Sequence, residues 1–126
     1  MPINLQMIEN DWILHFQVEK TWTPEEILTA KADTRRLFEA SQHPVHALVD
    51  LRDAAVNLAL LQASSQVIGG DMLPNAGRVA VVGVSWLMRT LAAPLLVLAV
   101  GSDAPSFFDD IEEAKRYLRR YITATT

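Results

Sequence analysis

Four polar side chains near the end of a short apolar run in the middle of the chain are the residues best placed for binding chemistry. The run VHALVDL contains Asp50, Arg52 and Asp53 come directly after it, and Asn57 follows a few residues later. Ligands of open α/β sheets bind at the edge where parallel strands end, and the amides at a helix start attract anions. Arg52 favours an anion there, whereas the two aspartates oppose one. The sequence therefore predicts a ligand-binding site, or else an ion pair that orders the loop.

A serine at a predicted strand-to-helix turn is the nearest approach to a catalytic nucleophile. Residues 83–87 read GVSWL, so Leu87 stands where a nucleophile elbow has its last glycine. Hydrolases with that motif place their histidine after the serine, but every histidine of this chain precedes Ser85. We expect Ser85 to cap a helix. No catalytic residue is predicted, and we expect that the protein is not an enzyme.

The three histidines do not form a recognisable metal site. His43 and His46 are close in sequence, but no carboxylate or third histidine lies at metal-ligand spacing, and zinc needs three or four ligands. We expect His43 in a loop, His46 on a strand facing a helix, and His15 exposed. The glycines form no phosphate-binding motif. The sequence therefore predicts neither a metal nor a cofactor.

The composition fits a single domain and excludes several classes of protein. The chain has 126 residues, of which 50% are apolar, so we expect one domain over residues 1–126 with a frayed tail at 123–126. It has no cysteine, which excludes disulfides and thiolate chemistry. A net charge of −4 opposes nucleic-acid binding. Because residues 1–11 lack a signal-peptide pattern and no apolar stretch is long enough to span a bilayer, we expect a cytoplasmic protein.

Apolar patterns of period two and of helical period alternate along the chain. Strands are predicted at residues 3–8, 12–18, 45–51, 78–83 and 107–108. Helices are predicted to begin after Thr23, Asn57, Ser85 and Asp109-Asp110. This order predicts an α/β fold with a mixed, mostly parallel sheet of four to five strands and about four helices.

Three of these elements have a clear inner face. The strand at 12–18 is expected to turn inward Trp12, Leu14, Phe16 and Val18. The first helix starts with a capping box and Pro24, and it is expected to bury Ile27, Ala30, Thr34 and Phe38, with Lys31 pointing elsewhere. The last helix is expected to turn inward Ile111, Ala114, Leu118, Tyr121 and Ile122.

The predicted third helix, residues 86–100, is apolar on more than one face and must be covered by something. Arg89 is its only charge, and Pro94 is expected to kink it. The residues proposed for an interface or an apolar pocket are Trp86, Leu87, Leu91, Leu95 and Leu98. A homodimer would cover this stripe with the same residues of both chains. The alternative is a carrier that holds an apolar or lipid-like ligand under this helix.

Five segments of the chain share a further pattern. They are Trp12 in an early strand, WTPEE at the first helix, VHALVDLRD, RVAVVG before an apolar helix, and the closing FFDDIEEAKRYL. Together they resemble the SpoIIAA-like branch of the STAS domains, which occur in sulphate transporters and anti-sigma-factor antagonists. The resemblance implies a STAS-like fold in an uncharacterised bacterial member. It also implies a binding or regulatory module that acts through contacts with a protein partner.

The chain departs from antagonist-type STAS domains at their phosphorylation switch. In domains of that type, a serine at the start of the second helix is phosphorylated. The strand before that helix ends in an aspartate, and Asp50 resembles this residue. Here the helix start reads Asn57-Leu58-Ala59, with no hydroxyl. Ser64 and Ser65 lie about two turns further along. The departure puts an anti-sigma partner in doubt.

We therefore expect a kinase that acts on STAS domains to leave residues 53–61 unmodified, because they offer no hydroxyl group. Mass spectrometry of the protein after incubation with such a kinase measures this, with an antagonist-type STAS domain as the positive control. Stoichiometric phosphate within 53–61 would contradict the expectation.

Overall fold

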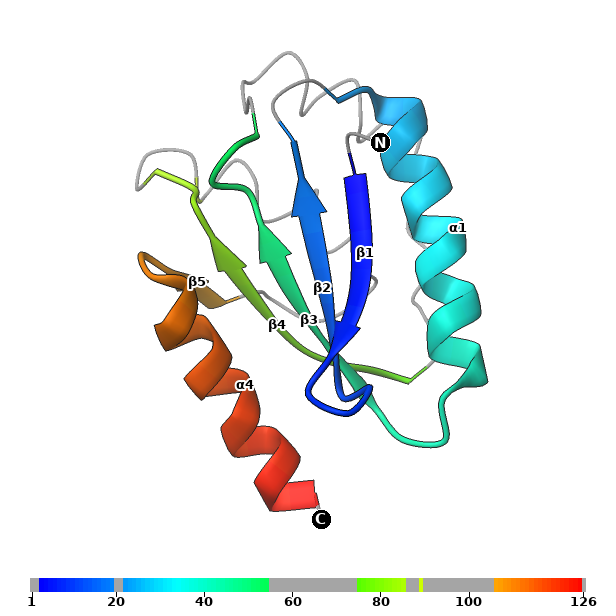
Figure 1. The fold of residues 1–126 in the computed structure, drawn as a ribbon, viewed down its shortest axis with the longest axis vertical. Helices are drawn as coiled ribbons and strands as arrows, with labels where there is room; N and C mark the ends of the chain where they lie inside the picture. The colour runs from blue at the N-terminus through cyan, green and yellow to red at the C-terminus, as the bar shows by residue number, and fades with distance from the viewer. Residues whose placement is uncertain (1–2, 20–21, 55–74, 86–88, 90–105, 126) are drawn as a thin grey trace.

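The computed structural model describes residues 3–19, 22–54, 75–85, 89 and 106–125. Its strands are β1 (Ile3–Ile8), β2 (Ile13–Val18), β3 (Val45–Asp50), β4 (Ala76–Val82) and β5 (Ser106–Phe108). Its helices are α1 (Pro24–Ala40) and α4 (Ile111–Thr125), shown in Figure 1. The two other predicted helices and the predicted kink at Pro94 lie outside the described residues.

The five strands form one sheet in sequence order. β1 pairs antiparallel with β2, and the pairs β2–β3, β3–β4 and β4–β5 are parallel. A tight turn joins β1 to β2, and Glu9, Asn10 and Asp11 take left-handed φ angles of 54°, 56° and 67° there. This arrangement confirms the predicted mixed, mostly parallel sheet of four to five strands.

The ends of α1 follow from its local sequence. Thr23 Oγ1 accepts a hydrogen bond from the Glu26 amide at 3.2 Å, and Pro24 occupies the first turn, where no amide donor is needed. The predicted inner face is confirmed, since Ile27, Ala30, Thr34 and Phe38 are all buried. Lys31 was predicted to point elsewhere, which is wrong, because it lies one turn after Ile27 and only 6% of it is exposed.

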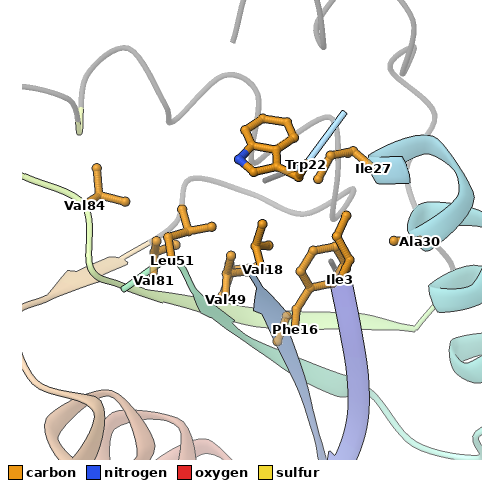
Figure 2. Close-up of a cluster of buried hydrophobic side chains, with 12 residues drawn as sticks. Ile3, Phe16, Val18, Trp22, Ile27, Ala30, Val49, Leu51, Val81 and Val84 are labelled. Atoms are coloured by element: carbon orange, nitrogen blue, oxygen red, sulfur yellow. The ribbon is translucent and has the colours of Figure 1, made fainter. Parts of the chain in front are cut away.

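Both faces of the sheet carry a hydrophobic layer. On the α1 side, Figure 2 shows Phe16, Val49 and Val81 from three neighbouring strands beneath Trp22 and Ile27. Phe38 of α1 extends this layer with Leu14 and Val45. On the other side, α4 packs Ala114 and Leu118 against Ile13, Leu48, Ala80 and Val82.

This double coverage corrects the inner face predicted for β2. Ile13 and Leu14 point to opposite faces and both are fully buried, because α4 covers one face and α1 the other. Trp12 precedes the strand, and its ring stacks on His43 with centroids 3.7 Å apart. The alternation of apolar residues therefore predicted the strand correctly, but it did not show that both faces of the strand are buried.

The helix α4 is longer than the sequence predicts. Ala114 and Leu118 are fully buried as expected, and Tyr121 and Ile122 are partly buried on the same side. The helix continues to Thr125, so residues 123–125 of the tail that was predicted to fray are helical. Ile122 packs against the α4-side core, which anchors the end of the helix.

Gly83 brings the chain after β4 very close to the chain after β3. Its φ is +93°, and a Cβ at this position would lie 2.4 Å from the Arg52 nitrogen and 2.7 Å from the Leu51 carbonyl carbon. Both obstacles are main chain, which cannot swing aside as a side chain can. A glycine is therefore required where these two strand ends meet.

We expect Gly83→Ala to lower the free energy of unfolding by more than about 2 kcal/mol, because backbone strain adds to a main-chain overlap. Urea denaturation at neutral pH measures the loss. The exposed Gln6→Ala serves as a control and should change stability by less than about 0.5 kcal/mol. A Gly83→Ala protein as stable as this control would show that the close approach is not rigid.

Candidate functional site

The carboxyl end of β3 carries three of the four predicted polar residues, Asp50, Arg52 and Asp53. Asp50 is the last residue of β3, and its side chain is only 3% exposed. Its Oδ1 accepts hydrogen bonds from the Arg52 amide at 3.2 Å and from Arg52 Nε at 2.9 Å. Its Oδ2 accepts from Arg52 Nη2 at 2.8 Å and from His15 Nε2 at 3.3 Å. We call Asp50, Arg52 and His15 the Asp50 cluster.

The electrostatics of the Asp50 cluster favour the ion-pair interpretation of these residues. Burial acts to raise the pKa of Asp50, but the hydrogen bonds from Arg52 and His15 outweigh it and hold that pKa below its ordinary value of 3.8. The hydrogen bond to Asp50 in turn raises the pKa of Arg52. Both groups are therefore charged at neutral pH, and Nε and Nη2 of Arg52 already bind Asp50.

Acidic side chains surround this edge. Asp53 is exposed, and Asp110, just before α4, lies close enough to act electrostatically on Arg52. Asp109 accepts a hydrogen bond from Arg89 Nη2 at 2.7 Å, and the Arg89 guanidinium carbon lies 5.6 Å from the centre of the Phe107 ring. The edge therefore presents a mixture of paired and exposed charges.

The remaining residues that the sequence singled out are not placed by the structure. They lie outside the described residues, and their roles stay predictions: Asn57, Trp86, Leu87, Leu91, Leu95 and Leu98.

His15 is the member of the Asp50 cluster that sequence reasoning missed. It was predicted to be exposed, which is wrong, since its side chain is 17% exposed and bonds to Asp50. The pairing of β2 with β3 sets Gln17 opposite Asp50 and His15 opposite Leu48, so His15 and Asp50 lie diagonally on one face. The sequence signal for its burial was a histidine that alternates with buried positions along a predicted strand. Only the register of β2 with β3 shows that this histidine lies near Asp50.

A second buried polar group lies at the opposite end of the sheet. His46 is 3% exposed, and its Nδ1 accepts a hydrogen bond from the Arg78 amide at 2.9 Å. Burial is the main cause that lowers the pKa of His46, followed by the charges of Arg78 and His43. Its ring lies 6.2 Å from that of Tyr121 on α4, so it faces a helix as predicted. A neutral histidine packed under α4 supports the fold.

The described residues include no candidate metal centre and no candidate membrane-spanning helix. No group of three or more histidine, aspartate or glutamate side chains there could hold a metal ion. Neither α1 nor α4 combines the length and the apolar character that crossing a bilayer requires.

Comparison with known proteins identifies the fold. No family model and no curated protein matches the chain. An uncharacterised protein of the DUF3478 family with a SpoIIAA-like fold, from Shewanella loihica PV-4, matches with a TM-score of 0.59 and 19% identity, covering 92% of this chain and 91% of that one. The protein TM1081, solved by NMR, matches with a TM-score of 0.54 and 17% identity, covering 92% and 87%. The chain therefore has a SpoIIAA-like α/β fold, as the sequence resemblance implied.

We expect Asp50→Asn to lower the free energy of unfolding at pH 7 by about 1–3 kcal/mol, because charge-assisted hydrogen bonds to a buried carboxylate are lost. The pKa of Asp50 is lower in the folded chain than in the unfolded chain. Its stabilisation is therefore complete above the unfolded pKa and is lost as the pH falls through the lower, folded pKa. Urea denaturation from pH 7 down to pH 3 should show the difference between the two proteins shrinking only below about pH 4.

Asp53→Asn is the matched control, since it removes an exposed carboxylate from the same loop. It should change stability by less than about 0.5 kcal/mol. Equal effects of the two substitutions, or a difference independent of pH, would show that the Asp50 cluster does not hold the loop.

Proposed function

We propose that this chain is a non-catalytic binding or regulatory module that acts through protein–protein contacts at the carboxyl edge of its sheet. One observation carries the proposal: the two oxygens of Asp50 accept four hydrogen bonds from Arg52 and His15. A carboxylate bound in this way fixes a surface loop and is not free to react. The loop presents Asp53 and the outer part of Arg52, whose side chain is 49% exposed, to a partner.

The protonation states at this edge support a non-catalytic role. The pKa of Asp50 lies below its ordinary value, so the carboxylate is a poor proton acceptor near pH 7. In the described part of the chain no hydroxyl group hydrogen-bonds to His15, so the base and nucleophile pair of covalent catalysis is not assembled there.

We further propose a cytoplasmic homodimer that uses the apolar stripe of residues 86–98. The support is the sequence, in which this segment has more apolar side chains than one sheet face can cover. A protein partner at the carboxyl edge and a second copy at residues 86–98 could bind at the same time, because the two proposed contacts use different residues.

The proposal is tested by partner recovery with two charge-reversal variants. We expect a protein that co-purifies stoichiometrically with the tagged chain from its source cells to be lost with Asp53→Lys, because the reversed charge lies at the proposed contact. The exposed Glu39→Lys, on α1, should retain that protein. If both variants lose the co-purifying protein, or if both retain it, the contact does not lie at the carboxyl edge.

Native mass spectrometry of the same preparation separates this proposal from the apolar carrier. A binding module should appear as the bare chain or its dimer, with no added small-molecule mass. A stoichiometric apolar adduct that Leu91→Glu or Leu95→Glu abolishes would favour the carrier and contradict the proposal.

A further inference from the structure

A groove of about 410 Å³ lies between the outer strand β1 and the first half of α1, and none of its lining residues belongs to the Asp50 cluster. Figure 1 shows α1 running beside β1, with the first residues of both elements at the same end of the molecule. The strand and the helix contribute the lining residues Ile3, Asn4, Leu5, Glu25, Glu26, Thr29, Ala30 and Asp33. We call this feature the β1–α1 groove.

One wall of the β1–α1 groove is an open sheet edge. β1 is the terminal strand of the described sheet and pairs only with β2 there. In an antiparallel pair, alternate residues turn their N–H and C=O groups away from the partner strand. These groups form a template on which an extended peptide can add as a further strand.

The charge of the groove is negative and largely uncompensated. Glu25 and Glu26 line it, and Glu19 is held beside it by a hydrogen bond from Asn4 Nδ2 at 3.2 Å. None of these three carboxylates makes an ion pair with another described residue, whereas Asp33 pairs with Arg36. The start of α1 contributes only about half a positive charge, so the three carboxylates dominate.

The repeat of side chains along α1 matches the repeat of same-face side chains along an extended strand. Four residues of α1 advance about 6 Å along its axis. Two residues of a strand advance about 6.6 Å, and alternate side chains of a strand share one face. Successive same-face side chains of an added strand would therefore meet successive turns of α1, first at Glu25 and Glu26 and then at Thr29 and Asp33.

We propose that the β1–α1 groove binds an extended, basic segment of a partner protein, which pairs with the open edge of β1. The lysine or arginine side chains of that segment lie on the α1 side of the sheet, where their aliphatic stems pack beside Ile3 and Leu5 and their charged ends reach Glu25 and Glu26. A second copy of this chain is disfavoured as the occupant. The sequence of β1, INLQMI, has no basic side chain that could meet Glu25 and Glu26 of another copy, and the net charge of the chain is −4.

The probe for this proposal is a capped peptide of alternating lysine and valine, with the length of β1. We expect isothermal titration calorimetry to show saturable binding, while a matched glutamate–valine peptide should not bind. Hydrogen exchange should show added protection at alternate amides of Ile3–Ile8, because only those amides face the open edge. A lysine–valine peptide methylated on alternate backbone nitrogens should not bind.

Two matched double variants test the charge of the groove. Glu25→Gln with Glu26→Gln should weaken peptide binding at least about fivefold, as expected when two partly exposed ion pairs are lost. Glu112→Gln with Glu113→Gln removes the same charges from the first turn of α4 and should leave the affinity unchanged. Asp53→Lys should also leave it unchanged, so failure of the carboxyl-edge contact and failure of this groove remain distinguishable.

Several results would overturn the proposal. They are equal binding of the lysine and glutamate peptides, equal weakening by the two double variants, and exchange protection confined to residues outside β1. Self-association that protects the β1 amides in the absence of peptide would identify a second copy as the occupant instead.

Discussion

All six residues of β3 are buried, because the strand lies in the middle of the sheet with side chains packed on both of its faces. A parallel strand in this position has its backbone groups satisfied by both neighbours, but it needs a helix layer on each side. The helices α1 and α4 each cover one of these faces. A polar residue at the end of such a strand must then find partners, since a buried carboxylate without them is costly.

Asp50 meets that requirement through its own loop and its neighbouring strand. The Leu51 amide bonds to the Val82 carbonyl at 2.8 Å, and Gly83 lets the segments after β3 and β4 lie against each other. Within the first of these segments, Arg52 bonds back to Asp50. His15 adds a bond from β2. The buried acid therefore ties β2, the end of β3 and the start of the following loop together. In the proposed function, the exposed charges around it are what a partner would meet.

The three polar regions of the molecule differ in how their charges are balanced. At the carboxyl edge, Arg52 and Arg89 offset nearby aspartates. At the opposite end of the sheet, His46 is buried with a lowered pKa and adds no charge near pH 7. Beside β1, Glu19, Glu25 and Glu26 form no ion pair with another described residue. The charges at the carboxyl edge and at the His46 end of the sheet are therefore balanced or absent. The β1–α1 groove differs from both, because its negative charge is complementary to a basic partner.

Local signals in the sequence determined much of the fold but little of the site. The capping box set the start of α1, apolar runs located the strands, and their alternation with helices predicted a mostly parallel sheet. These features depend on residues a few positions apart. Sequence could also place Asp50 and Arg52 at a strand end. Only the tertiary structure decided that His15 bonds to Asp50, that Ile13 and Lys31 are buried, and that α1 forms a groove with β1. Each depends on strand register or on which helix covers which face, and those are set by contacts between residues far apart in the chain.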